Sequence, residues 1–432
     1  MDSYLALEKT LLLLCADLAL IVAAARFFGW LFGKVGQPAV VGEILAGVIL
    51  GPSLLGRLYP GAIAVLLPPK TTSILSAFAQ VGLILLMLLI GLEFPFDRLR
   101  HAAKASLSVA VAGIVVPFAS SYALAGWLYR LSPGGSSLTA FRLFFATAVS
   151  ITAIPIMGRI LMHTRLTRTR MGLTSITAAA MDDVLGWLLL GAVVAAVTHG
   201  GVGFGRLSLS FLGVIALAVL FWALGRFGVA RLKVPRTPAG GLPAGWLAVV
   251  LTAAFACATV TNALGVFSIF GGFLCGIAGS FHPDLREAIK ASIGDLVAVL
   301  FLPVFFVFSG LRTDVGSLGS DPRLWLALAA VIAVSCASKF GATSLAARAS
   351  GLPWKESLSI GLLMNTRALM ALVVINIGAD MGVVSPVAFF WLVTMALFTT
   401  VITTPILRRN YPSPEALGFE DRPAQSGVVR PR

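Results

Sequence analysis

Residues 174–193 read TSITAAAMDDVLGWLLLGAV, and they place two adjacent carboxylates, Asp182 and Asp183, in the middle of an apolar segment. The pattern around them predicts one helix over residues 171–198, with eleven residues before Asp182 and fifteen after Asp183. A charge at the centre of a membrane span costs about 2.5–3.5 kcal/mol on insertion scales, and such charges mark functional sites. The alternative interpretation is a helix-end charge that lies deeper than expected. The segment therefore predicts a transmembrane helix with an ionic centre.

The composition extends this prediction to the whole chain. Of its 432 residues, 58% are hydrophobic and 12% are charged, whereas soluble domains carry about 25% charged residues. Such a chain has too few polar side chains to cover a soluble surface, which excludes a soluble enzyme, a disordered protein and a fibrous repeat. A transmembrane helix takes roughly 20–25 residues. The sequence therefore predicts an all-α polytopic membrane protein with short loops.

Apolar segments separated by turn signals predict about thirteen transmembrane helices within one transmembrane domain, residues 1–410. The turn between the eighth and ninth helices is the least marked, since only Thr261 and Asn262 indicate it. Residues 411–432 hold four prolines and no hydrophobic periodicity, so they predict a short disordered cytoplasmic tail. The predicted helices lie near residues 8–32, 38–56, 71–93, 104–129, 138–162, 171–198, 208–231, 244–261, 264–281, 288–311, 323–349, 355–379 and 384–407.

The distribution of positive charge predicts the orientation. The net charge is +14, and much of the excess lies in the third, fifth and seventh loops and just after the last helix, for example at Arg98, Arg168, Lys233 and Arg408. Because cytoplasmic loops carry the excess of Lys and Arg, the N-terminus is expected outside and the C-terminus in the cytoplasm of a bacterial-type inner membrane. No basic stretch is interleaved with aromatic residues, so the lipid bilayer is the expected partner and nucleic acid is not.

A second buried charge is Lys339, within the apolar segment ALAAVIAVSCASKFGATSLAARA. A lysine at this depth needs a carboxylate or tends to lose its proton. Asp182 and Asp183 are both candidates for that partner. The alternative is a lysine whose long side chain reaches the membrane surface.

Two predicted helices carry interruptions. Thr152 and Pro155 interrupt the fifth, and Asn365, Thr366 and Arg367 interrupt the twelfth. Interrupted segments at matching places in two halves of a chain are typical of inverted-repeat transporters with an ion site at the membrane midplane. Free backbone groups at the half-helix ends can contact the ion there. The two interruptions, together with the aspartates, therefore predict an ion site at the midplane, with Arg367 as a possible supporting residue.

The remaining polar groups carry less information. Glu43, in a glycine-rich span, and Asp295, before an apolar run, could support an ion route, although structural pairing is the favoured interpretation of both. The cysteines lie in apolar runs without CxxC spacing, and the sequence holds no metal-ligand motif or nucleophile elbow, so no cofactor is predicted. Adjacent aspartates point about 100° apart on a helix, which argues against an aspartyl protease. The protein is not expected to be an enzyme.

At these residues the sequence resembles the monovalent cation:proton antiporter family 2, the Kef-type and sodium/proton exchanger group. The resemblance extends from Gly36 to about Met370. The segment MNTRALMALVVINIG looks most like the branch that includes the plant cation/proton exchangers. The segments that carry the resemblance are GQPAVVGEILAGVILGPSLLG, GLILLMLLIGLEF, SITAIPIMGRIL, AAAMDDVLGW, FLPVFFVFSGLRTD and GLLMNTRALM.

The resemblance implies an antiporter fold in which a core domain with two crossing broken helices moves against a dimerisation domain. This arrangement gives elevator-type alternating access in a homodimer. By motif match, Asp183 is the implied aspartate that binds the monovalent cation or the proton, and Asp182 is its neighbour that pairs with Lys339. Thr152 and Asn365 would flank the ion. The double aspartate with a lysine resembles electrogenic members of the family.

The sequence also departs from the family pattern. Gln80 stands where an acidic residue is frequent, and Ala368 and Ala371 replace a frequent Gly and a frequent acidic residue. The cytosolic nucleotide-binding domain of Kef-type systems is absent from the chain, which argues against gating through such a domain. The leading prediction is exchange of protons for Na⁺ or K⁺. The alternatives are an exporter of an organic or ionophore-bound cation and a gated cation efflux channel.

Overall fold

The computed structural model describes residues 2–59, 61, 68–93, 104–152, 154–163, 166, 169–198, 204–238, 240–264 and 267–410. These residues form helices joined by turns, with no strand in the ranges given. The predicted tail, residues 411–432, lies outside them. The helices are α1 (Asp2–Lys34), α2 (Ala39–Leu50), α3 (Leu55–Leu58), α5 (Pro69–Leu92), α7 (Lys104–Leu131), α8 (Leu138–Ser150), α9 (Ile154–His163), α10 (Arg170–Thr198), α11 (Phe204–Ala223), α12 (Ala244–Ala263), α13 (Ser268–Gly279), α14 (Pro283–Leu296), α15 (Leu302–Leu311), α16 (Pro322–Ala349), α17 (Trp354–Met364), α18 (Leu369–Asp380) and α19 (Pro386–Asn410).

The predicted spans are confirmed as helical segments. Within the described residues, eleven segments are long and apolar enough to cross a membrane. The other two predicted spans contain the shorter apolar helices α8 and α13. The fifth span is divided into α8 and α9, and the ninth is a helix of twelve residues. Twelve helical residues extend only about 18 Å, less than the roughly 30 Å of the hydrocarbon core.

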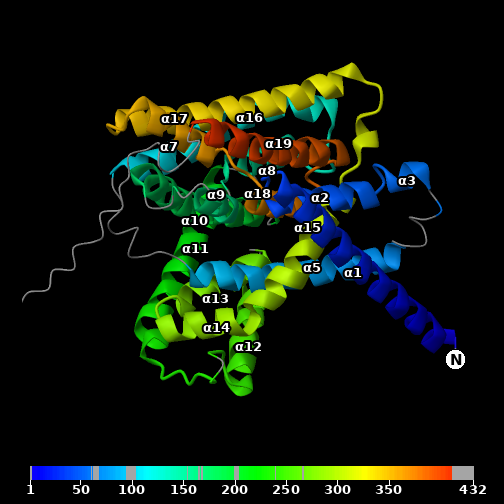
Figure 1. The fold of residues 1–432 in the computed structure, drawn as a ribbon, viewed down its shortest axis with the longest axis vertical. Coiled ribbons are helices and arrows are strands. Elements are labelled where there is room, and N and C mark those ends of the chain that lie inside the picture. The colour runs from blue at the N-terminus through cyan, green and yellow to red at the C-terminus, as the bar shows by residue number, and fades with distance from the viewer. Residues whose placement is uncertain are drawn as a thin grey trace, which may run out of the picture.

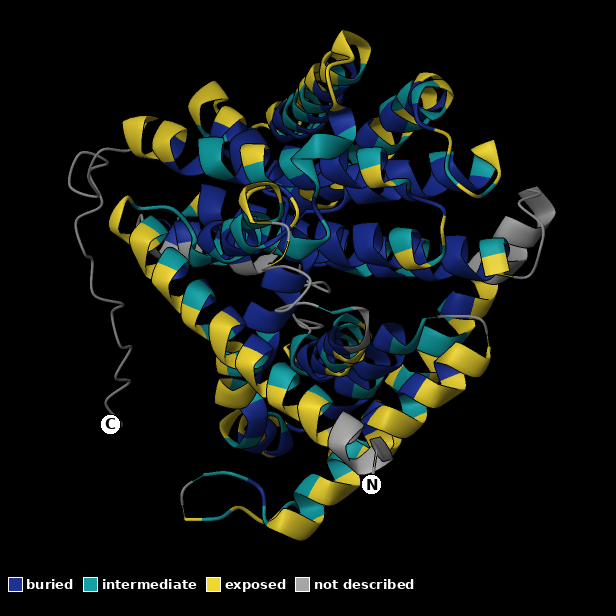
Figure 2. Ribbon diagram, turned by 90° about the vertical axis from the view of Figure 1, so that its right-hand side faces the viewer, coloured by how far each residue is buried: buried dark blue, intermediate teal, exposed yellow. Residues whose placement is uncertain are grey.

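The helices divide into two bundles: in Figure 1 α7, α16, α17 and α19 lie at the top, α12 and α14 at the bottom, and α2 and α15 at middle height. The site bundle consists of α7–α10 and α16–α19, and its helices pack mainly on one another, as α7 does on α16 and α8. The scaffold bundle consists of α1, α2, α5 and α11–α15, with close packing of α5 on α13 and of α2 on α15. Side chains in the middle of the molecule are buried, whereas the exposed ones lie mainly on the outer helices (Figure 2).

Glycines set the closest helix crossings in the scaffold bundle. At the crossing of α2 and α15, a Cβ atom added to Gly47 would lie 2.0 Å from the carbonyl oxygen of Val307, and one added to Gly310 would lie 2.2 Å from that of Ile44. Only a residue without a side chain permits this approach of two backbones.

The crossing of α5 and α13 repeats this geometry. A Cβ atom on Gly91 would lie 2.3 Å from the Phe273 carbonyl oxygen, and one on Gly276 would lie 2.2 Å from the Leu88 carbonyl oxygen. In all four cases the contacted carbonyl lies three residues before the partner glycine. The first half of the chain contributes α2 and α5 to these crossings, and the second half contributes α13 and α15. Taken in chain order, α2 therefore corresponds to α13 and α5 corresponds to α15.

A third contact extends the match to α1 and α12, the helices that precede α2 and α13. Gly42 of α2 lies against α1, where an added Cβ atom would be 2.3 Å from the carbonyl oxygen of Phe28. Gly271 of α13 lies against α12 in the same way, at 2.4 Å from the carbonyl oxygen of Cys257. Both glycines precede the crossing glycine of their helix by five residues. These matched contacts are the internal repeat that the two interrupted helices predicted.

The glycine crossings give a stability prediction. Gly47→Ala should lower the unfolding temperature in detergent, because overpacking at a closed contact costs typically about 1–3 kcal/mol. Gly341→Ala in α16 is the matched control, because nothing lies within 4 Å of its added Cβ atom. Alanine also has the better helix propensity, by about 1 kcal/mol. Equal unfolding temperatures for the two variants would contradict the close crossing.

Candidate ion site

The two interrupted helices meet at their breaks. Helix α8 ends at Ser150 and α9 begins at Ile154. Pro155 has no backbone N–H, so it cannot donate the hydrogen bond that would continue α8 into α9. Helix α17 ends at Met364 and α18 begins at Leu369. The Thr152 hydroxyl donates a hydrogen bond of 3.0 Å to the Met364 carbonyl oxygen. A side chain of the first break is therefore bonded to the backbone of the second.

A buried ion pair lies beside the first break. The Lys339 ammonium is 2.8 Å from Asp182 Oδ2, and neither side chain is exposed to solvent. The same carboxylate oxygen accepts a 3.0 Å hydrogen bond from the Thr152 backbone N–H, and Lys339 also donates to the Ser150 carbonyl oxygen. The negative group thus lies at the start of α9 and the positive group at the end of α8. Each complements the helix dipole and the free backbone groups there.

These contacts settle which aspartate is near the lysine. The contact between Lys339 and Asp182 that the resemblance implied is present. The alternative prediction, that the Lys339 side chain reaches the membrane surface, is wrong, because this side chain has no exposed area. Helix α7 closes one side of the ammonium, since a Cβ atom on Gly113 would lie 3.7 Å from Nζ. The role of the pair in ion transport stays a prediction.

Asp183 lies in a different environment from its neighbour. Its side chain is buried, and its Oδ1 atom has no hydrogen-bond partner among the described residues. Asn365, at the end of α17, resembles it: its Nδ2 atom contacts Cys336 Sγ at 3.6 Å, while its Oδ1 atom has no partner in the part of the chain that the structure describes. Oδ1 of Asp182 is also buried and has no partner within the same residues. Buried acceptors are almost always satisfied in folded proteins, so the carboxylate oxygens fit a bound proton or cation and the amide oxygen fits a bound cation.

The second buried cation, Arg367, is turned toward α16 and α19. Its guanidinium donates to the Ser335 hydroxyl at 2.8 Å and to the Ser335 carbonyl at 3.0 Å, and it contacts Met395 Sδ at 3.3 Å. The Arg367 carbonyl accepts a 2.5 Å hydrogen bond from Thr400. Arg367 therefore helps to fix the second break, and with Lys339 it balances the two buried aspartates in charge.

Sequence reasoning did not identify Ser335 or Ser150 as part of this region. Ser335 precedes Lys339 by one helical turn, and this spacing is a signal that could have found it. Ser150 takes part through its backbone carbonyl, which its side-chain chemistry does not announce.

The two supporting carboxylates named from the sequence lie elsewhere. Asp295 is an exposed residue of α14, a helix that packs on α5 and on the turn before α15. Glu43 is half-buried in α2, with a carboxylate oxygen 3.7 Å from a Cβ atom added to Gly29 of α1. Both therefore belong to the scaffold bundle, whereas the four main site residues and Lys339 belong to the site bundle.

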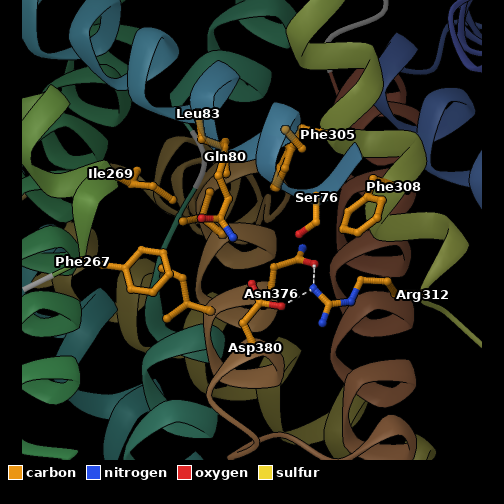
Figure 3. Close-up of a pocket in the computed structure, with 13 residues that line it drawn as sticks. Ser76, Gln80, Leu83, Phe267, Ile269, Phe305, Phe308, Arg312, Asn376 and Asp380 are labelled. Atoms are coloured by element: carbon orange, nitrogen blue, oxygen red, sulfur yellow. Dashed lines mark hydrogen bonds and ion pairs between the residues drawn. The ribbon is translucent and has the colours of Figure 1, made fainter. Parts of the chain in front are cut away.

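The departures from the family pattern fall in two places. Ala368 and Ala371 are buried at the start of α18. Gln80 lines a pocket between the two bundles, together with Arg312, Asn376 and Asp380 (Figure 3).

Sequence comparison relates this chain to known proteins. The sequence model of the family described as "Sodium/hydrogen exchanger, transmembrane" matches residues 21–409. The Na⁺/H⁺ antiporter NhaS4 of Synechocystis is 37% identical over 408 residues, which cover 94% of this chain and 99% of the relative. Cation/H⁺ antiporter 17 of Arabidopsis thaliana is 34% identical over 96% of this chain and 50% of its own length. The chain thus spans about half the length of this plant relative.

A structural comparison gives the same fold. The sodium proton antiporter MjNhaP1 of Methanocaldococcus jannaschii superposes with a TM-score of 0.66 over 95% of this chain and 99% of that one. The two sequences are 16% identical, so the likeness concerns the fold alone. The matched family and relatives confirm the resemblance found in the sequence motifs: this chain is an integral membrane protein that belongs to the sodium/hydrogen exchanger family.

Proposed function

We propose that the protein exchanges protons for a monovalent cation, Na⁺ or K⁺, at one site in the site bundle. The observation that carries the proposal is Asp183, a buried carboxylate whose Oδ1 atom accepts no hydrogen bond from any described residue. Since a proton and a cation would both satisfy this oxygen, they compete for it and their exchange is coupled. The relative from Synechocystis is named a Na⁺/H⁺ antiporter, and a further relative from Saccharomyces cerevisiae, 28% identical, is named a K⁺/H⁺ antiporter. Both names support this class of transport.

The neighbouring residues have separate roles in the proposal. Asp183, Thr152 and Asn365 provide oxygen ligands for the cation, with Asp182 as a second carboxylate. Lys339 neutralises Asp182 and keeps the start of α9 in place. Arg367 fixes the second break through Ser335.

Alternating access in the proposal is of the elevator type. The broken helices and all four proposed ligands belong to the site bundle, so a movement of this bundle against the scaffold would carry the ion with its ligands intact. Each net charge moved across the membrane adds about 2.3 kcal/mol per 100 mV, so an electrogenic cycle would respond to voltage.

The proposal includes a homodimer in a bacterial-type inner membrane, with the N-terminus outside and the C-terminus in the cytoplasm. The scaffold bundle offers an exposed apolar surface for the dimer contact. In α1 and in α12, only 17% of the most apolar 18-residue segment is buried. The corresponding share for the segment from α17 to α18 is 94%, which fits an interior position next to the ion.

Proton flux in proteoliposomes tests the proposal. The purified protein should dissipate a preset pH gradient when Na⁺ or K⁺ is added. An imposed membrane potential should change the rate of this proton flux if the cycle is electrogenic. The same assay with Li⁺ and with choline separates alkali cations from a general cation. The absence of any cation-dependent proton flux would overturn the proposal.

One observation favours a second candidate, the exporter of an organic cation. A mostly apolar groove between α16, α17 and α19 is lined by Ala333, Phe340, Leu362 and Ile402, and it reaches Asn365. A hydrophobic cation could enter along such a groove. Proton flux driven by tetraphenylphosphonium, and not by Na⁺ or K⁺, would support this candidate over the first.

A further inference from the structure

A pocket lined by apolar residues and a cluster of polar side chains lies between the two bundles, away from the ion pair of the site. The scaffold bundle contributes Ser76 and Gln80 from α5 and Phe308 with the adjoining Arg312 from α15. The site bundle contributes Asn376 and Asp380 from α18. Figure 3 shows the polar side chains of the three helices turned toward one another. A relative movement of the bundles must therefore change this pocket.

An ion pair and a hydrogen-bonded amide join the bundles here. Arg312 Nη1 lies 2.7 Å from Asp380 Oδ1 and donates to Asn376 Oδ1 at 3.1 Å. The Nδ2 atom of Asn376 donates back to the Ser309 hydroxyl of α15 at 2.8 Å. Among the ion pairs of the described side chains, this is the one that joins the two bundles; the others lie within one bundle.

Aromatic rings hold the guanidinium in position. Arg312 lies over Phe308 of its own bundle, with 5.6 Å between the guanidinium carbon and the ring centroid. It also lies over Phe389 of α19 at 5.7 Å. Cations are attracted to ring faces at such distances. The side chains of the pair remain partly exposed, 27% for Arg312 and 31% for Asp380. A pair that water reaches at one edge can open and close without a large penalty.

We propose that the Arg312–Asp380 pair closes one mouth of the cation route, the mouth between α5, α15 and α18. The inference deepens the proposed antiport function and rests on it. In the closed arrangement, the Arg312 guanidinium is paired with the Asp380 carboxylate, which an incoming monovalent cation would otherwise meet first. When the bundles shift apart, Asp380 becomes free, and Gln80 and Asn376 line the way inward. By the orientation proposed from the loop charges, this mouth faces outside.

Thiol labelling at the pocket tests the closure without any need for transport. In the full chain carrying Gln80→Cys, a charged maleimide is applied in lipid nanodiscs, where both faces meet the reagent. Labelling at position 80 is read by peptide mass spectrometry. Asp380→Asn and Arg312→Gln should each raise the labelling rate about two- to fivefold, the change in population that loss of one partly exposed ion pair supports. The reversed pair, Arg312→Asp with Asp380→Arg, should return the rate toward that of the starting protein.

Lys290→Gln provides the matched control. It breaks the ion pair of Lys290 with Glu93, whose side chains are 48% and 58% exposed and which lies wholly within the scaffold bundle. An unchanged labelling rate in both pocket variants, or an equal rise in the control, would overturn the closure. The labelling is repeated in an Asp183→Asn background. Labelling reports the closure and proton flux reports antiport. Because the Asp183→Asn background carries no antiport in the proposal, a change in labelling there tests the closure separately from the antiport function.

Discussion

Asp183→Asn is expected to abolish cation-dependent proton flux in proteoliposomes while the protein still folds. The asparagine side chain has nearly the same shape, but it carries no charge and does not exchange a proton near neutral pH. Because Asp183 Oδ1 accepts no hydrogen bond within the described part of the chain, the substitution breaks no bond to those residues at that atom. Flux against Na⁺ and K⁺ and the elution profile in size-exclusion chromatography measure the two halves of the expectation.

Asp284→Asn is the matched control for this substitution. Asp284 is an aspartate of the scaffold bundle whose side chain is 63% exposed and pairs with Arg236. Its replacement should leave the flux unchanged, since an exposed ion pair contributes little to stability. Normal flux from Asp183→Asn would contradict the proposed role of Asp183. Loss of flux in both variants would point to a general effect of the substitution.

Lys339→Met is expected to produce the largest loss of stability. Removal of one partner from a buried ion pair costs about 3–5 kcal/mol, because the other charge remains buried without compensation. The Ser150 carbonyl, to which Lys339 also donates, loses a donor in the same substitution. The unfolding temperature in detergent should fall well below that of the starting protein.

A double-mutant cycle separates the ion pair from general packing. Asp182→Asn combined with Lys339→Met removes both charges, so the double variant should be less destabilised than the sum of the two single variants. Lys290→Met is the control, because its exposed pair with Glu93 contributes about 0–1 kcal/mol. Additive effects of Asp182→Asn and Lys339→Met would show that the two side chains do not stabilise each other.

The sequence predicts the spans and both breaks because these depend on local composition. Pro155 cannot continue a helix without loss of a backbone hydrogen bond, and Asn365, Thr366 and Arg367 are polar at a depth where hydrocarbon is expected. Such signals can be read without knowledge of the neighbouring helices. The shortness of α13 was harder to read, because only Thr261 and Asn262 mark the preceding turn and the apolar run continues through it.

Contacts between distant segments cannot be read in this way. Asp182 and Lys339 are separated by 157 residues, and the motif match, more than local pattern, distinguished Asp182 from Asp183. Arg367 could have faced the aspartates; packing turns it toward Ser335 instead. The pair of Arg312 and Asp380 depends on how the two bundles meet, which no single helix encodes.

The two glycine crossings have a consequence for the direction of transport. A frame built from two equivalent halves gives the inner and outer faces of the protein nearly the same shape, so concentration gradients decide which way ions flow. The residues two positions after the glycines break this equality, because Glu93 follows Gly91 and Arg312 follows Gly310. Glu93 pairs within the frame and Arg312 pairs across it. We therefore expect the ion-free protein to favour the conformation in which the Arg312 side is closed. The two halves have the same architecture, and the opposite charges of Glu93 and Arg312 make the two faces unequal.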